Sequence, residues 1–144
     1  MYLTHYGVKG MKWGVRRYRN KDGSLTPAGK KKNEKELKKK MKARNTELFI
    51  NSHNYAAKRS GAVNDKWSKK MKGYANWQDS PKYDDYMKEV LKEYMDLSNE
   101  YLKTDKRAQF TTKVGETYTA RYTEEYGQQL IWGTAKEWDD YRSK

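Results

Sequence analysis

Apolar and aromatic side chains recur every three or four positions over a stretch of 40 residues, and this spacing constrains the fold most strongly. The stretch follows Ser80-Pro81, a pair typical of a helix start, because serine caps free N–H groups and proline suits the first helical position. A period of about 3.5 residues aligns the side chains in a seam that packs against another helix. The sequence therefore predicts a long helix over residues 81–126. The seam consists of Tyr83, Met87, Val90, Tyr94, Leu97, Tyr101, Thr104, Ala108, Thr111, Gly115, Tyr118 and Tyr122.

The seam weakens between residues 104 and 115, where small and β-branched residues replace large apolar ones. Residues 109–114 include several of types enriched in strands, which leaves a short β excursion open at that point. The seam also has a candidate partner earlier in the chain, a narrower apolar stripe over residues 37–74. If this pairing leaves aromatic surface exposed, we expect the chain to form a homo-oligomer through residues 83–122.

The stripe before the seam reads as two further helices. Thr26-Pro27 repeats the capping signal, and apolar residues follow at helical spacing, which predicts a helix over residues 27–59. Gly61 interrupts the pattern, and helices are predicted over residues 62–74 and, after the seam, 128–141.

The predicted fold class is therefore mainly α. We expect an elongated helical bundle or coiled-coil-like hairpin over residues 30–144. Residues 1–29 contain half of the ten glycines, interleaved with basic and aromatic residues. Glycine at this density disfavours a regular helix, so this segment is predicted to be a loop-rich basic arm, with a turn at residues 20–23.

Charge is concentrated at one end of the chain. Residues 1–46 contain 15 Lys/Arg and 3 Asp/Glu, a net charge of +12, whereas residues 47–144 contain 17 and 16 and carry +1. Such asymmetry indicates an anionic partner for the basic end, either nucleic acid, an acidic protein surface or anionic lipid. No stretch of 18 apolar residues is present. We therefore expect the protein to be synthesised in the cytoplasm and not to associate with a membrane.

The arm and the start of the first helix supply the candidate binding residues. Lysine and arginine contact phosphates, and aromatic rings stack on bases, so the arm is suited to nucleic acid. The alternative is that its aromatic residues fold back onto the helical domain as a structural clasp. The choice between DNA, RNA and an acidic protein remains open. The candidates are Lys9, Lys12, Trp13, Arg16, Arg17, Tyr18, Arg19, Lys30, Lys31 and Lys32.

The residues that enzymes and metalloproteins require are scarce or badly spaced. The chain has no cysteine, and its two histidines, His5 and His53, are 48 residues apart, which makes a zinc site unsupported. Adjacent carboxylates such as Asp84 and Asp85 point in different directions on a helix, so they do not converge as an acid–base pair. No nucleophile elbow, P-loop or dinucleotide fingerprint is present. We therefore expect a non-catalytic protein without metal or cofactor.

The N-terminal residues form a recognisable motif. They read His5-Tyr6-Gly7-Val8-Lys9-Gly10-Met11-Lys12-Trp13-Gly14-Val15-Arg16-Arg17-Tyr18, then Asn20-x-Asp22-Gly23-Ser24-Leu25-Thr26-x-Ala28-Gly29-Lys30. This segment resembles a short module that recurs in proteins of tailed bacteriophages and prophages of Gram-positive bacteria, often encoded near head and packaging genes. The resemblance implies a phage setting and supplies no catalytic residues. The rest of the chain resembles no known family.

Two functions are compatible with the basic end and the phage setting. The first is a virion-associated or head-assembly accessory protein whose basic N-terminal third binds DNA or an acidic structural protein. The alternative is a phage effector that binds and inhibits a host nucleic-acid enzyme or defence complex. The protein is accordingly expected in the virion, or in the host cytoplasm during infection.

Overall fold

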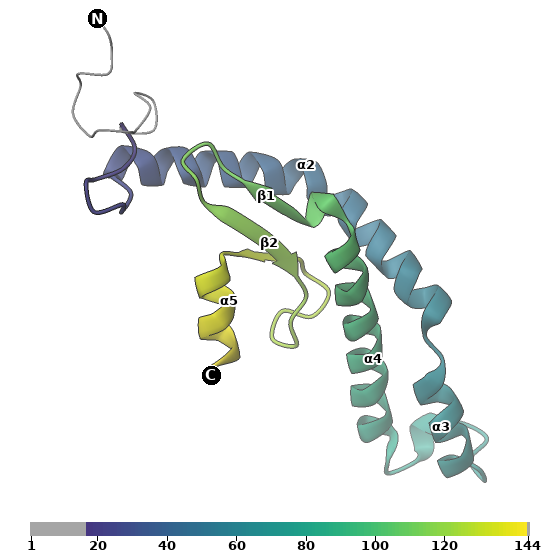
Figure 1. The fold of residues 1–144 in the computed structure, drawn as a ribbon. Coiled ribbons are helices and arrows are strands. Elements are labelled where there is room, and N and C mark those ends of the chain that lie inside the picture. The colour runs from purple at the N-terminus through teal and green to yellow at the C-terminus, as the bar shows by residue number, and fades with distance from the viewer. Residues whose placement is uncertain (1–16, 144) are drawn as a thin grey trace, which may run out of the picture. The chain divides into compact units, whose positions relative to one another are not determined.

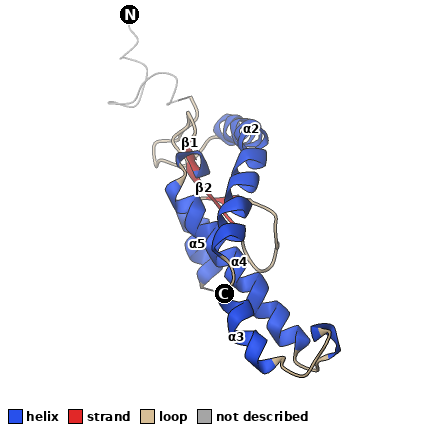
Figure 2. Cartoon of the chain, turned by 90° about the vertical axis from the view of Figure 1, so that its right-hand side faces the viewer, coloured by secondary structure: helices blue, strands red, loops and turns tan. Residues whose placement is uncertain are grey.

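A computed structural model describes residues 17–143 of the 144-residue chain. These residues are mainly helical, which confirms the predicted fold class, and they include a small three-stranded sheet in the order β1-β2-β3 (Figures 1 and 2). The elements are α2 (Pro27–Arg59), α3 (Ala62–Lys70), η2 (Trp77–Asp79), α4 (Tyr83–Thr104), η3 (Lys106–Ala108), β1 (Gln109–Thr111), β2 (Thr117–Arg121), β3 (Ile131–Gly133) and α5 (Ala135–Arg142).

The chain divides into two compact units. Unit 1 comprises residues 1–44, 109–119 and 133–144, and unit 2 comprises residues 45–108 and 120–132. Helix α2 contributes its first half to unit 1 and its second half to unit 2. Residues 17–29, which the sequence assigned to a separate arm, belong to unit 1.

The predicted helix over residues 81–126 begins two residues later, at Tyr83, and is wrong beyond Thr104. Strands β1 and β2 form an antiparallel hairpin there, with Phe110 opposite Tyr118. Its turn closes with hydrogen bonds from the N–H of Gly115 to the carbonyl of Thr112 (2.9 Å) and from the N–H of Thr112 to the carbonyl of Glu116 (2.8 Å). Gly115 has a φ of +92°, which suits the left-handed position of such a three-residue hairpin loop. The glycine that weakened the helical seam is therefore the turn residue of a hairpin.

Two other predicted helices have different bounds in the structure. Helix α3 ends at Lys70, four residues before the predicted end, and is followed by a turn in which Gly73 has a φ of +101°. The last helix begins at Ala135 instead of residue 128, because strand β3 occupies residues 131–133. Its start is a capping box: the Thr134 hydroxyl accepts from the N–H of Glu137 (3.2 Å), and the Glu137 carboxylate accepts from the N–H of Thr134 (3.1 Å).

The predicted start of α2 is confirmed in detail. The Thr26 hydroxyl accepts a hydrogen bond from the N–H of Gly29 (3.0 Å) and donates one to the carbonyl of Arg17 (3.2 Å). The backbone of Tyr18 lies so close to this first turn that a Cβ on Gly29 would be 2.1 Å from the Tyr18 carbonyl oxygen. The segment before the helix is thus folded against it, and glycine is required at position 29.

A buried asparagine joins α2 to the hairpin inside unit 1. The Asn33 side-chain amide donates to the Tyr118 hydroxyl (2.7 Å) and its carbonyl oxygen accepts from the Thr112 hydroxyl (2.6 Å). Burial raises the pKa of Tyr118, so this phenol stays protonated at neutral pH. Helix α5 closes the unit through Trp138, whose indole N–H donates to the carbonyl of Thr119 (3.1 Å).

In unit 2 the second half of α2 runs antiparallel to α4, beside it in Figure 1. Leu48, Ser52 and Ala56 have no exposed surface and form the stripe of α2 that faces the core. Contacts between the two helices include rings of His53 and Tyr94, whose centroids are 5.1 Å apart. The helical part of the predicted seam therefore packs within its own unit.

A carboxylate at the end of α4 bonds to the residues on either side of it, where the chain leaves the helix toward β1. Asp105, whose side chain is 8% exposed, accepts from the guanidinium of Arg107 (2.8 Å) and from the Tyr101 hydroxyl (2.6 Å). Arg107 also pairs with Glu47 of α2. Hydrogen bonds from Arg107 hold the pKa of the Asp105 carboxyl well below its ordinary value.

We expect Gly29→Ala to lower the free energy of unfolding by about 1–3 kcal/mol, because its Cβ would overlap the Tyr18 carbonyl. Helix propensity alone favours alanine by about 1 kcal/mol, so the sign of the effect is diagnostic. Chemical denaturation measures it, with Lys30→Ala at the next, exposed position as the control. A stabilised Gly29→Ala variant would show that Tyr18 does not lie against α2.

We expect Asp105→Asn to destabilise the protein at pH 7 by about 1.5–3 kcal/mol, the range for hydrogen bonds to charged groups. Because the pKa of Asp105 is depressed by folding, its contribution is complete above about pH 4 and declines as the pH falls below that value. Denaturation at pH 7 and pH 3 should therefore show the difference between parent and variant shrinking in acid. Asp96→Asn, on the exposed face of the same helix, should change stability by less than about 0.5 kcal/mol at either pH.

Candidate anion-binding surface

Five lysines cover the outward side of the first half of α2. The helix advances about 100° per residue, which puts these side chains within one broad arc opposite the buried Asn33. All five are exposed, whereas Leu37, Lys40 and Arg44 on the inner side are half-buried. We refer to this surface as the lysine face, and it consists of Lys31, Lys35, Lys38, Lys39 and Lys42.

The lysine face has little internal neutralisation. Lys38 pairs with Glu34 at 3.3 Å, and both side chains are exposed. The other four lysines form no ion pair with the described residues. Like charges at helical spacing repel, so the surface is destabilising unless an anion covers it.

The start of α2 adds to this imbalance. Its first turn contains no acidic residue, although Lys30, Lys31 and Lys32 follow immediately. The N-terminus of a helix carries a partial positive charge and favours anions, so this placement opposes the helix dipole. Unit 1 as a whole contains 19 Lys/Arg against 7 Asp/Glu, a net charge of +12, while unit 2 contains 13 against 12.

Two basic residues of the same helix have a different role. The Lys40 ammonium lies 5.5 Å and the Arg44 guanidinium 5.1 Å from the centroid of the Phe110 ring. Arg44 also donates to the carbonyl of Gln109 (3.3 Å). These cations hold strand β1 against α2, and their stems cover apolar surface.

Arg19, a predicted binding residue, is bound internally. Its guanidinium donates to the carbonyls of Val114 (2.8 Å) and Gly23 (2.6 Å) and pairs with Glu116 (3.0 Å). The Arg19 side chain is only 20% exposed. The structure therefore assigns Arg19 to a clasp between the turn at residues 20–23 and the tip of the β1–β2 hairpin.

The clasp explains much of the recognisable motif. Gly23 has a φ of +89° in the predicted turn, and the Asp22 carboxylate accepts from the N–H (3.0 Å) and hydroxyl (2.6 Å) of Ser24. These hydrogen bonds lower the pKa of Asp22. With the Thr26 cap and Gly29, they give the second half of the motif a structural function within unit 1.

The remaining candidate binding residues differ in exposure. Arg17, Lys30 and Lys31 are exposed, and Tyr18 and Lys32 are half-buried. Lys9, Lys12, Trp13 and Arg16 lie outside the described residues. The predicted set stopped at Lys32 and did not include Lys35, Lys38, Lys39 and Lys42, although their spacing of three or four within the basic run marks them as one side of a helix.

Comparison with known proteins gives one match. Residues 1–20 match a family of unknown function, DUF7211. No curated protein and no solved structure matches the chain. The match covers the start of the motif, and its description assigns no activity, ligand or partner.

Within residues 17–143, no three His, Asp or Glu side chains are grouped so that they could hold a metal ion. None of the helices in that range is both long and apolar enough to cross a membrane.

We expect Arg19→Gln to affect stability and Lys39→Gln to affect binding. Arg19→Gln should lower the melting temperature, because hydrogen bonds to a charged group contribute about 1.5–3 kcal/mol each when partly buried, and should leave DNA binding unchanged. Lys39→Gln should leave stability within about 0.5 kcal/mol of the parent and weaken DNA binding at low salt. Thermal unfolding and fluorescence anisotropy with labelled DNA measure both. A variant pair with the reverse pattern would show that Arg19 contacts the partner and that Lys39 does not.

Proposed function

We propose that the protein binds an anionic polymer, DNA in the first place, through the lysine face and the basic residues that precede it. The observation that carries the proposal is the lysine face itself, five exposed lysines on one side of a helix with a single paired carboxylate. The candidate residues Lys9, Lys12, Trp13, Arg16 and Arg17 precede α2 in the sequence and are proposed to contribute to the same binding.

The geometry favours a polyanion over a small anion. From Lys31 to Lys42 the helix rises about 16 Å, so the charges are spread along a convex surface and do not converge on one point. DNA carries one negative charge per about 1.7 Å of its axis and offers a matching row of phosphates. Binding of this kind positions the protein on the backbone and reads little sequence.

The biological setting in this proposal is a bacteriophage particle. We infer a virion-associated or head-assembly accessory protein, with packaged DNA as the partner. The support is the resemblance of residues 5–30 to the phage module. The DUF7211 match overlaps the first part of that segment and adds no function. Mass spectrometry of purified particles tests the setting, because a structural component is present at stoichiometric amounts and an effector is absent.

The sharpest test of DNA binding replaces four lysines of the lysine face together. We expect the variant with Lys31, Lys35, Lys39 and Lys42 all changed to Gln to lose affinity for duplex DNA. Each phosphate contact contributes about 0.9 to the slope of log K against log salt, so the slope should fall by up to about 3 to 4. Anisotropy titrations between 50 and about 200 mM salt measure it. Helix content should stay that of the parent, because all four side chains are exposed.

The matched control changes four exposed lysines of unit 2, Lys69, Lys72, Lys103 and Lys106, to Gln. The net charge falls by the same amount, but the lysine face is intact, so affinity and slope should stay near those of the parent. Equal losses in the two variants would show that binding follows net charge and would overturn the assignment to α2. Binding of an acidic protein with no binding of DNA would replace DNA as the partner.

A further inference from the structure

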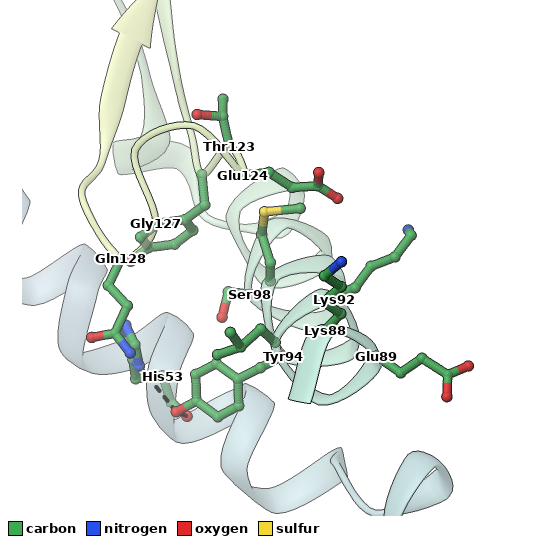
Figure 3. A pocket seen from close by; sticks show the side chains of 13 residues that line it. His53, Lys88, Glu89, Lys92, Tyr94, Ser98, Thr123, Glu124, Gly127 and Gln128 are labelled. Carbon is green, nitrogen blue, oxygen red and sulfur yellow. Dashed lines mark hydrogen bonds between the residues drawn. The ribbon is translucent and has the colours of Figure 1, made fainter. Parts of the chain in front are cut away.

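Unit 2 contains a cavity of about 560 Å³ that the lysine face does not touch (Figure 3). Helix α4 forms one wall, residues 122–128 after strand β2 form the other, and His53 of α2 closes it between them. The volume lies within the range of small-molecule sites, about 300–1,000 Å³.

The cavity follows the axis of α4. Its lining residues on that helix include Lys88, Leu91, Met95 and Ser98, which are spaced by three or four and so share one side of the helix. Ten residues from the first to the last correspond to about 15 Å. A site of this length suits an extended chain better than a compact ring system.

The middle of the cavity is apolar. Leu91 is 58% exposed, and it is one of few large apolar side chains left open to solvent among the described residues. Met95, one turn further along, lines the same wall. Covering this surface with an aliphatic chain removes apolar area from water, which is favourable.

One end of the cavity has an unused hydrogen-bonding group. The Ser98 side chain lines the cavity and is only 2% exposed, and its hydroxyl has no hydrogen-bond partner among the described residues. A buried hydroxyl without a partner is destabilising, and nearly all buried polar groups in proteins are paired. A ligand group that hydrogen bonds to Ser98 would satisfy it.

The charges around the cavity favour an uncharged head group. His53 shares a hydrogen bond with the Tyr94 hydroxyl (3.0 Å), and burial lowers the pKa of its imidazole, so it is neutral at pH 7. The charged residues of the lining are Lys88, Lys92, Glu89 and Glu124, two of each sign, and Lys92 and Glu89 are paired with Asp96 (3.0 Å) and Lys66 (2.7 Å) outside it. Because the charges of the lining balance, a charged group beside Ser98 would gain no net counter-charge and would be costly to bury.

We propose that this cavity binds an uncharged single-chain amphiphile, such as a fatty alcohol. Its hydroxyl hydrogen bonds to Ser98, and its chain lies over Met95 and Leu91 toward Lys88. The site is independent of the proposed DNA binding, because its residues all belong to unit 2 and the lysine face belongs to unit 1.

Three ligands with the same chain and different head groups test the proposal: 1-octanol, octanoate and octylammonium. We expect calorimetry on the full chain to show saturable one-to-one binding of 1-octanol, at least tenfold tighter than either ion. Amide NMR shifts should be confined to residues lining the cavity. Absence of saturable octanol binding overturns the site, and tighter binding of either ion overturns the uncharged head group.

Two variants test the named contacts. Ser98→Ala should bind 1-octanol about tenfold more weakly, the effect of one hydrogen bond, while its melting temperature stays equal or rises because an unpaired hydroxyl is removed. Leu91→Gln should weaken octanol binding several-fold, whereas Ile50→Gln, at an exposed aliphatic residue of α2 outside the cavity, should not. Unchanged affinity in Ser98→Ala overturns the hydrogen bond. Equal losses in Leu91→Gln and Ile50→Gln show adsorption to exposed apolar surface and overturn the cavity as the site.

Discussion

The buried amide of Asn33 is the interaction on which the basic end of the molecule depends. The first half of α2 offers only Leu37 and Met41 as large apolar residues, too few to hold a helix by hydrophobic burial alone. Asn33 instead bonds to two hydroxyls of the β1–β2 hairpin, Thr112 and Tyr118. A network of buried polar groups is strong when every member is satisfied and specifies one arrangement, so it fixes which side of α2 faces inward.

The orientation of α2 divides its basic residues into an inward-facing and an outward-facing group. Once Asn33 faces the hairpin, Lys40 and Arg44 fall on the inner side and lie against Phe110. The lysine face then points to solvent, and Glu34 is the only one of the described residues that forms an ion pair with it. A single helix therefore uses some cations as packing groups and leaves others exposed, where we propose that they bind an anion. Which of these roles a lysine takes depends on its angle around the helix, so the basic run as a whole has no single role.

Features that depend on neighbouring residues could be predicted from the sequence, whereas features that depend on contacts between distant residues could not. The start of α2 was predictable because Thr26 and Pro27 act within one turn. The prediction of a helix over residues 81–126 was wrong after Thr104, because the residues there also fit a period of two. Every other side chain is buried at Ala108, Phe110, Thr112 and Val114, and again at Tyr118, Ala120 and Tyr122, which is the alternation of strands. The partners of Asn33 are 79 and 85 residues away, and Ser98 lines a cavity with residues from α2 and from the chain beyond β2, so no local pattern marks either.

Two places in the described structure break rules that the rest obeys. At the start of α2, lysines stand at the positive end of a helix dipole, where carboxylates are favoured. In unit 2, the hydroxyl of Ser98 is buried without a partner among the described residues, whereas the hydroxyl of Tyr122, which lines the same cavity, bonds to Ser52 at 2.8 Å. Neither feature stabilises the isolated chain. A bound anion would compensate the first, and a ligand with a hydrogen-bonding group would compensate the second. Where local physical rules fail without an internal compensation, function is the usual reason. The two features belong to different units, so the two proposed binding sites are separate.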